Sequence, residues 1–566
     1  MTDATSPPPR LLPRSIAIAA AGLLLATFVL RGEDSLRRES PTWDETMHLD
    51  YGLNFLRLGP SVPPRDHPYP VTALLALPLA VATPDEGQVA ARGPLPDGGG
   101  VAELRKVENP RNLWPARRMN LMLAAAGLAL AGWWIGRRAG TGIGLAFLAA
   151  GTLDPGFLAP ARYVTTDAAL GLALLAGTLA AWRHRETGSI GSLVAAGVAC
   201  GVGLTAKFSA VLLVPGVFLA MLPGAAPGDP AAAGKGVTGP FACVPPTWTG
   251  RLRRAVIAAT VAGAVGAAVY LAVFHVHALL GLAPWGAGME HLARAMKDFV
   301  RIRSEARGTF LLGGFFEGGT PLYFPVLLAA KTPLAMLVLA PLPFALPEGR
   351  SALRRYAPFF AVPVVYLAAS IASGVNLGHR HLAPVLPALW LLAAIGTVTL
   401  AGRVRRGTAV AVAAVGVLAL EGALAHPHYL PFQNALFGGI DCAWRVAVDS
   451  ATDWGQDLPA LKAWADAEAP GQPLHLAYFG TADPAAYGLQ TVWRPCKPLG
   501  RPRPGRDAPA APCRAGAPVL AVSATCLQGA AGGATRDNCW AWLRDRTPDA
   551  IVGGSILVYR DVPDPP

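Results

Sequence analysis

Residues 14–30 read RSIAIAAAGLLLATFVL, a run in which Arg14 is the only charged side chain. A helix needs about 17–25 mostly apolar residues to cross the hydrocarbon core of a bilayer, so we expect this run to span a membrane. Further runs of the same kind follow along the chain. The expected spans are residues 14–30, 119–135, 141–158, 168–182, 190–205, 207–222, 255–279, 323–345, 357–372, 382–400 and 408–425.

The composition of the 566-residue chain agrees with a membrane protein. It is 52% hydrophobic and 15% charged, whereas an average soluble domain is about 25% charged. The net charge is +12, from 48 basic and 36 acidic residues, a balance that is also found in nucleic-acid-binding proteins. Arg pairs at the ends of the expected spans account for the excess. We therefore assign the positive charge to membrane topology and expect no nucleic-acid partner.

The positions of these Arg pairs predict the orientation, because cytoplasmic loops of membrane proteins are enriched in Lys and Arg. Arg137–Arg138, Arg183–Arg185 and Arg403–Arg406 all face the cytoplasm if residues 69–83 (YPVTALLALPLAVAT) do not span. We therefore expect 69–83 to be a re-entrant or interfacial segment. This gives about eleven transmembrane helices, a cytoplasmic N-terminus and an extracytoplasmic C-terminus, in a multi-pass protein of the cell (inner) membrane. Lys207 alone separates two spans, which form either a hairpin or one kinked stretch.

The same topology divides the chain into a membrane module, residues 1–425, and a C-terminal domain, residues 426–566. The module carries outer loops at 31–118 and 280–322. The C-terminal domain contains the strand-like runs HLAYFG, APVLAVSA and AIVGGSILVYR, which predict a small extracytoplasmic α/β domain. Five of its residues are cysteines, and an oxidising compartment would permit disulfides whose pairing the sequence leaves open. These cysteines are Cys442, Cys496, Cys513, Cys526 and Cys539.

The first outer loop opens with PTWDETMHLDYGLNFLRLG, which places Asp44, Glu45 and His48 directly beyond the first span. A carboxylate beside a membrane surface is a candidate general base, because partial burial raises its pKa toward working pH. Asp44 and His48 are one helical turn apart and would face the same site. The structural alternative is a capping box at a helix start, formed by Thr42 and Glu45.

A second set of charged residues lies at the outer ends of later spans. Asp167 opens an apolar run, where it is either a site residue or a helix cap. Lys207, Lys331 and Arg380 lie at the same boundary. Lys and Arg side chains can snorkel to the interface without a specific role, or they can bind a phosphate group as point charge or bidentate fork. Arg380, with His379 and His381 beside it, is the strongest candidate, because its positive charge runs against the topological bias.

A divalent metal ion is a further candidate ligand for the first outer loop. His48, His67, Asp66 and Glu45 offer suitable donor atoms, although their spacing matches no diagnostic zinc motif. The chain contains no Walker loop, no GxGxxG after a strand and no GxSxG motif.

Several of these segments together resemble a known family, the lipid-carrier-dependent glycosyltransferases of the GT-C fold. The likeness is greatest to family 39, which includes protein O-mannosyltransferases and aminoarabinose transferases. The matching segments are WDETMHLDYGLNFLRLG, DHPYPVTALLALPL, LDPGFLAPARYVTTDAAL, GLTAKFSAVLLVP, YFPVLLAAKTPL, NLGHRHLAPVLPAL, YLPFQNALFGG and DSATDWGQDLPAL, in this order. Tyr69 stands where the family usually has a second proline, and the likeness is poorer after about residue 466.

The resemblance implies a membrane enzyme that moves a sugar, mannose or similar, from a polyprenyl-phosphate donor to a hydroxyl acceptor outside the cytoplasm. The acceptor would be a protein, a lipid or a glycan. Asp44 would be the catalytic carboxylate, with Glu45 supporting it and Asp167 as a second acidic residue. Lys331 and Arg380 would lie near the lipid phosphate, and His379, His381 and Lys207 belong to the same expected site. His48 and His67 remain the candidate metal ligands.

Two functions from other classes fit parts of the pattern. A secondary transporter would also be polytopic and basic with intramembrane acids, although we find no repeat between the two halves. A non-catalytic assembly subunit would use the cysteine-bearing C-terminal domain to bind a partner.

Overall fold

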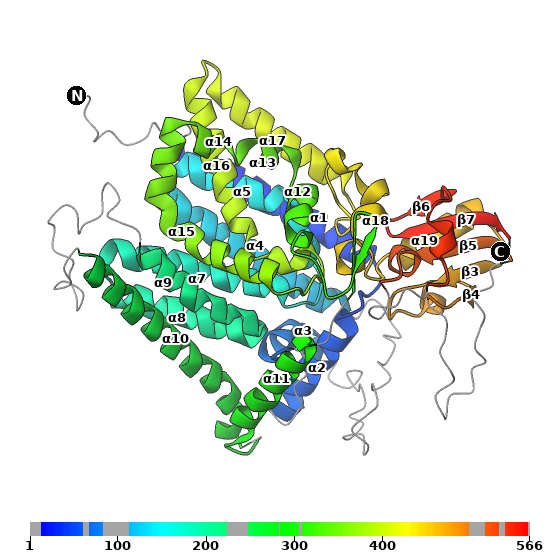
Figure 1. Cartoon of the computed structure of the whole chain (residues 1–566), viewed down its shortest axis with the longest axis horizontal. Coiled ribbons are helices and arrows are strands. Elements are labelled where there is room, and N and C mark those ends of the chain that lie inside the picture. Colours follow the sequence, from blue (N-terminus) through cyan, green and yellow to red (C-terminus); the bar gives the residue numbers. More distant parts are fainter. Residues whose placement is uncertain are drawn as a thin grey trace.

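The computed structural model describes residues 13–59, 67–82, 113–222, 247–281, 283–304, 308–496, 516–530 and 538–563. Helices make up most of the chain as far as Leu424, and a small sheet follows at one end of the helical part (Figure 1). Asp66, Cys243 and Cys513 lie outside the described residues, as do residues 83–112 of the first outer loop.

Six helices in the described part are long and apolar enough to cross a membrane, which makes the chain a multi-pass membrane protein. They are α1 (Arg14–Arg37), α4 (Trp114–Ala139), α10 (Trp248–Leu279), α15 (Pro347–Ala372), α16 (Leu386–Arg403) and α17 (Gly407–Leu424). Their outward side chains are apolar: Leu23, Leu30 and Leu424 are each about 70% exposed, as expected for a surface that contacts lipid.

Two more expected spans are helices that bend sharply. The first pairs α5 (Thr141–Leu153) with α6 (Pro155–Ala161) at 63°, and the second pairs α12 (Tyr323–Lys331) with Leu334–Ala345 at 109°. The second partner comprises α13 (Leu334–Leu339) and α14 (Leu342–Ala345). A proline follows each break, and proline cannot donate the backbone hydrogen bond that would continue a helix.

Of the remaining expected spans, α8 (Ile190–Ala206) and α9 (Leu213–Met221) are shorter helices. The helix α7 (Asp167–Thr187) has 21 residues but carries Asp167 in its first turn and His184 and Arg185 in its last turn. Extended backbone at Lys207 reverses the chain, and the Cys200 thiol lies 3.7 Å from the carbonyl oxygen of Ala210, so α8 and α9 form the hairpin alternative. Length and composition thus support six spans, or eight with the bent pairs, because several of the eleven expected spans are short helices.

Residues 69–83, expected not to cross the membrane, form α3 (Pro70–Ala82), an apolar helix of 13 residues. The first outer loop also contains α2 (Glu45–Leu58), and the second contains α11 (Ala287–Ser304), β1 (Thr309–Leu311) and β2 (Gly314–Phe316). Strands β1 and β2 pair as an antiparallel hairpin.

Small residues allow the helices to approach closely. A Cβ atom added at Gly144 of α5 would lie 2.4 Å from the Cα atom of Gly136 in α4. In the same way, Gly197 and Gly201 of α8 pack against Val265 and Val269 of α10. Such contacts are typical of helix packing in membranes. Helices there associate through close van der Waals packing, and small residues allow their backbones to approach.

The C-terminal part contains a five-stranded sheet with the order β4–β3–β5–β7–β6, which agrees with the expected α/β domain. Strand β3 is parallel to β4 and β5, whereas β7 is antiparallel to β5 and β6. The strands are β3 (Leu474–Ala477), β4 (Thr491–Trp493), β5 (Ala517–Ser523), β6 (Ala550–Val552) and β7 (Ile556–Val562), and the helices are α18 (Ala443–Val446), α19 (Leu458–Glu468) and α20 (Ala524–Leu527). A disulfide joins Cys496 to Cys526.

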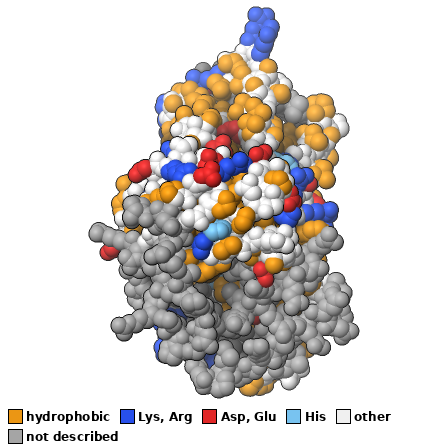
Figure 2. Space-filling model, turned by 90° about the vertical axis from the view of Figure 1, so that its right-hand side faces the viewer, with side chains coloured by type: hydrophobic (Ala, Val, Ile, Leu, Met, Phe, Trp, Pro, Cys, Tyr) orange, Lys and Arg blue, Asp and Glu red, His pale blue; other side chains and the backbone are white. Residues whose placement is uncertain are grey.

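The first outer loop and the C-terminal part are tied together by backbone hydrogen bonds. The amide of Ser40 donates to the Gln456 carbonyl over 2.8 Å, and the amide of Trp43 donates to the Trp454 carbonyl over 2.9 Å. Figure 2 looks at the side that carries the sheet, where charged side chains of both signs lie across the middle of the surface. The candidate site lies at this junction between helices and C-terminal part.

Candidate active site

Asp44 lies at the N-terminal end of α2, directly after the strand-like contact between the first outer loop and residues 454–456. Its side chain is 21% exposed and forms an ion pair with Arg380, with 3.0 Å between the Asp44 Oδ2 and Arg380 Nη2 atoms. It makes no side-chain capping hydrogen bond to α2. Asp44 is therefore a partly accessible carboxylate that faces a cation, and it does not serve as the cap of its own helix.

Arg380 connects Asp44 to the second expected acidic residue. It lies on the 3₁₀ helix η4 (His379–Leu382), and its Nη1 atom is 3.1 Å from Oδ2 of Asp167. The pKa of Arg380 is raised: burial acts to lower it, but Asp167 and Asp44 outweigh burial. One guanidinium thus bridges two carboxylates that are more than a hundred residues apart in the chain.

Lys207 completes the charge balance. Its ammonium lies 2.8 Å from Oδ1 of Asp167 and 3.4 Å from Nε2 of His381. Asp167 is the first residue of α7, where the helix dipole also favours a negative charge. Its side chain is only 1% exposed and both of its oxygens are engaged, so Asp167 holds the two cations in place and is poorly accessible to a substrate.

Trp454 stabilises Arg380 from the side of the C-terminal part, with the guanidinium carbon 4.1 Å from the centre of the ring. A cation–π contact of this kind attracts a desolvated guanidinium and limits its movement. The preceding 3₁₀ helix η7 (Asp449–Ala451) packs on η4 at Gly378, which has a φ of +99°. A Cβ atom at Gly378 would lie 2.6 Å from the Ser450 hydroxyl, so this close approach requires glycine.

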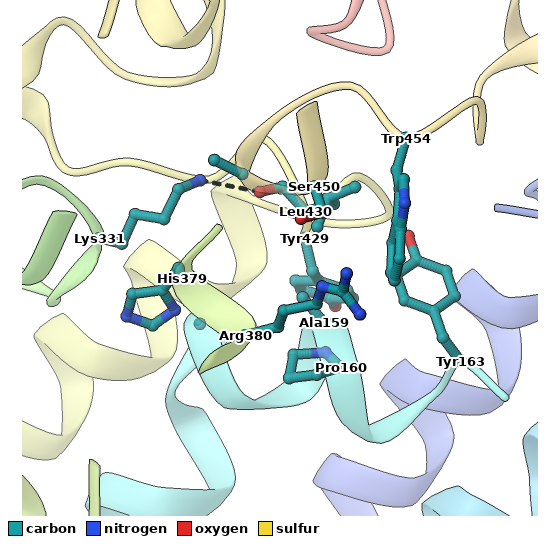
Figure 3. A pocket seen from close by; sticks show the side chains of 12 residues that line it. Ala159, Pro160, Tyr163, Lys331, His379, Arg380, Tyr429, Leu430, Ser450 and Trp454 are labelled. Atoms are coloured by element: carbon teal, nitrogen blue, oxygen red, sulfur yellow. Dashed lines mark hydrogen bonds between the residues drawn. The ribbon is translucent and has the colours of Figure 1, made fainter. Parts of the chain in front are cut away.

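A cavity borders Arg380, and Trp454 also lines it (Figure 3). Figure 3 shows Lys331 and His379 across the cavity from Trp454 and Tyr163, with Arg380 between them. The Lys331 ammonium donates to the carbonyl oxygens of Leu430 and Phe432, each over 2.9 Å, which leaves one N–H group for a ligand.

Two further nitrogens around this cavity lack a hydrogen-bond partner among the described residues, namely Nε of Arg380 and Nε2 of His379. Burial and then the nearby Lys331 charge lower the pKa of His379 to about 3, so its imidazole is neutral at pH 7. The cavity therefore offers the fixed positive charge of Arg380, the amine of Lys331 and unpaired nitrogens, an environment that suits a phosphate group.

Glu45 occupies a different environment from its neighbour Asp44. It is fully buried and accepts hydrogen bonds from Nε and Nη2 of Arg117, over 2.8 and 2.6 Å. The backbone amides of Thr42 and Val164 also donate to it, over 2.9 and 2.8 Å. The bond from Thr42 is the return half of a capping box. Glu45 thus anchors the start of α2 and does not face the cavity.

The expected metal ligands of the first outer loop lie close together. The His48 and His67 rings are 5.3 Å apart in an edge-on arrangement. Burial, the largest effect on both, lowers the pKa of His48 and places that of His67 well below its usual value, so both imidazoles are neutral. Glu45 is occupied by Arg117, and Asp66 lies outside the described residues. A metal at His48 and His67 stays a prediction.

Sequence reasoning missed two residues that shape the site, Trp454 and Arg117. Trp454 lies in the segment DSATDWGQDLPAL, whose likeness to the family is visible in the sequence, but its contact with Arg380 is not. Arg117 looks like an ordinary charge at a helix start. Its burial beside Glu45 depends on a contact between residues 72 positions apart.

Comparisons with known proteins support the resemblance that the motifs suggest. Residues 103–225 match the sequence model of the family described as dolichyl-phosphate-mannose-protein mannosyltransferase. This segment holds Asp167 and Lys207. A comparison with curated proteins finds no match to the chain. The family match thus confirms, over residues 103–225, the predicted likeness to lipid-carrier-dependent glycosyltransferases.

The chain is also similar in fold to solved membrane-protein structures. For ArnT from Cupriavidus metallidurans, in the apo state and bound to undecaprenyl phosphate, the identity is 14% and the TM-score 0.45. The similarity covers 97% of this chain and 98% and 99% of the two ArnT chains. An oligosaccharyltransferase from Archaeoglobus fulgidus is 13% identical with a TM-score of 0.41, over 73% of this chain and 53% of that one.

Proposed function

We propose that the chain is a membrane glycosyltransferase that transfers a sugar from a polyprenyl-phosphate donor to a hydroxyl acceptor on the outer face of the membrane. The observation that carries this proposal is the position of Arg380. Its guanidinium pairs with the partly exposed Asp44 on one side and borders the cationic cavity with Lys331 on the other. The proposed base and the proposed phosphate site are thus both in contact with Arg380.

The proposed reaction is a direct displacement at the anomeric carbon of the donor sugar. Asp44 accepts the proton of the acceptor hydroxyl while the oxygen forms a bond to that carbon. The bond from the carbon to the phosphate oxygen breaks, and the lipid phosphate leaves with its electron pair. Arg380 and Lys331 stabilise the negative charge that develops on the phosphate. A single displacement inverts the configuration at the anomeric carbon.

The two carboxylates have different roles in this scheme because they differ in accessibility. Asp44 is 21% exposed and forms an ion pair with Arg380. Asp167 is 1% exposed and engages both Arg380 and Lys207. Asp44 is therefore the proton acceptor, and Asp167 is a positioning residue that holds Arg380 between the base and the cavity. Lys207 and His381 support Asp167.

The lipid-linked donor follows from the topology and from the sequence. Asp167 begins α7 and Arg185 lies in its last turn, so the charged site lies at the end of the helix opposite to its basic end, which the positive-inside rule favours as the outer end. The chain contains no Walker loop and no GxGxxG after a strand. A polyprenyl carrier would present the sugar from the outer leaflet. The sugar would be mannose or a similar one, and the acceptor a protein, a lipid or a glycan.

The test is a transfer reaction with the purified full-length chain in proteoliposomes, supplied with a set of polyprenyl-phosphate sugars and candidate acceptors. Mass spectrometry of the products identifies sugar and acceptor together, and parallel reactions with a chelator test for a required metal. We expect a glycosylated product from one lipid-linked donor. Labelled substrate that accumulates in vesicles without any covalent product would instead support a transporter.

A further inference from the structure

Three separate segments meet where the C-terminal part joins the helices, outside the Asp44 site. Glu39 follows α1, His428 follows α17, and Asp457 precedes α19. Each residue offers one ligand atom, and these three atoms all lie within 4.8 Å of one another. Glu39 and Asp457 are buried, whereas the side chain of His428 is 24% exposed.

Glu39 has one oxygen fixed by the protein and one without a partner. Its Oε2 atom pairs with Arg162 and accepts a hydrogen bond from the Tyr163 hydroxyl over 2.7 Å. Its Oε1 atom is buried and has no hydrogen-bond partner among the described residues. The residue is only 3% exposed. A buried carboxylate oxygen without a partner carries a desolvation cost that a bound cation would offset.

Asp457 also has one oxygen fixed by neighbouring side chains, whereas its other oxygen is paired with His428. Its Oδ2 atom accepts hydrogen bonds from the Gln456 amide over 2.7 Å and from the Ser555 hydroxyl over 2.6 Å. Its Oδ1 atom lies 3.1 Å from Nδ1 of His428. In protein metal sites, hydrogen bonds from neighbouring groups to a carboxylate orient it as a ligand.

We propose that Glu39, His428 and Asp457 bind a divalent transition-metal ion that ties the C-terminal domain to the membrane module. One imidazole nitrogen and two carboxylate oxygens suit Zn²⁺ or Mn²⁺. Two carboxylates against the single charge of Arg162 leave a net negative charge for the ion to neutralise. Metal–ligand bonds of about 2.1 Å bring ligands of one ion to within about 4 Å of each other, so a small side-chain movement suffices.

The site has an entry path and a role that does not depend on the proposed transferase activity. The exposed part of His428 gives an ion access from solvent. The three ligands come from segments on both sides of the junction, so an ion bound by all three stabilises the folded chain over the unfolded one.

The experiment measures metal binding and melting temperature on the full-length chain in detergent, stripped with a chelator and titrated with Zn²⁺ or Mn²⁺. We expect at least one equivalent of one of these ions to bind, one of which is lost in His428→Gln, and the melting temperature to rise with metal concentration. His428→Gln should weaken binding by at least about tenfold and abolish that rise. Glu39→Gln should do the same, which keeps the test valid if one variant folds poorly.

His426→Gln is the matched control, because His426 lies two residues away but bonds to Asp34 and Tyr429. This variant should bind the ion as the wild-type chain does. Two outcomes would overturn the proposal. One is a wild-type chain whose melting temperature responds to neither ion and that binds less than stoichiometric metal, as expected if a protonated His428 bridges the carboxylates. The other is an equal metal response in wild type and His428→Gln.

Discussion

Asp44 and Glu45 are adjacent in the chain, yet their surroundings assign them to different tasks. Asp44 meets one guanidinium and remains partly exposed, whereas Glu45 is buried among five donors from Arg117, Thr42 and Val164. A carboxylate whose oxygens are already occupied by buried donors has no free position for a substrate proton. The sequence motif indicates an acidic pair, and only the structure shows that Asp44 is accessible while Glu45 is held by buried donors.

Glu45→Gln should therefore reduce stability before it changes the chemistry. Removing one partner of a buried ion pair leaves the other charge uncompensated and costs about 3–5 kcal/mol. We expect a lower melting temperature and a lower yield of folded protein. Glu33→Gln is the control, because Glu33 pairs with the half-exposed Arg37 and Arg118, and surface pairs contribute about 1 kcal/mol or less. Equal melting temperatures for the two variants would contradict the anchoring role of Glu45.

Among the elements, η4 positions the site because it carries His379, Arg380 and His381 in one short turn. It is held from two sides, by α7 through Asp167 and by the segment that contains Ser450 of η7 and Trp454 just after it. The sequence predicts the importance of NLGHRHLAP from its charges. It does not predict the contacts that hold this turn in place, because residues 449–454 follow about seventy positions later in the chain.

Gly378→Ala should move η4 and lower transfer activity. A side chain at φ +99° is strained, and the Ser450 contact allows no room for a Cβ atom, so we expect a stability loss of about 1–3 kcal/mol. The measurement is the melting temperature together with turnover. Gly416→Ala on α17, where a Cβ would meet nothing within 4 Å, is the control and should be neutral. A fully active and stable Gly378→Ala variant would show that η4 does not depend on this contact.

The C-terminal sheet should respond to acid through His475 on β3. Burial and then the charge of Arg494 lower the pKa of His475, and its Nδ1 atom lies 2.8 Å from Nη2 of Arg494. The unfolded chain, with a His pKa of about 6.5, binds more protons than the folded chain below that pH, so this contribution to stability is lost as the pH falls.

Between pH 7.5 and 5.5, the melting temperature of His475→Gln should fall by less than that of wild type. This interval brackets the His pKa of about 6.5 in the unfolded chain. Thermal unfolding at both pH values measures this difference directly. An unchanged pH dependence in the variant would assign the acid sensitivity to other groups.

For the whole molecule, the sequence predicts the membrane class, the C-terminal α/β part and most charged site residues. Apolar runs are local signals, so each expected span contains a helix. The composition does not reveal the bends at Asp154 and Thr332, nor that α8 and α9 are short. For this reason fewer helices reach spanning length than the eleven expected spans. The contacts Arg380–Trp454 and Glu39–Arg162 join residues far apart in sequence, so only the folded chain reveals them.

The proposed orientation predicts which cysteines an impermeant reagent can reach. Asp466 on α19 and Arg405 between α16 and α17 are both exposed but lie on opposite sides in the expected topology. In a background with both Cys243→Ser and Cys442→Ser, Asp466→Cys should react with a membrane-impermeant maleimide in intact cells. Arg405→Cys should react only after the cells are permeabilised, and the reverse pattern would invert the topology.

The most direct measurement for the central claim compares sugar transfer by the wild-type chain and by Asp44→Asn, in the same proteoliposomes with the same polyprenyl-phosphate donor. Asparagine keeps the shape of the side chain but cannot accept the proton. The account predicts that turnover falls by at least about 10²-fold while the melting temperature stays near that of wild type. Transfer by Asp44→Asn at the wild-type rate would contradict the account, because Asp44 would then not be the base.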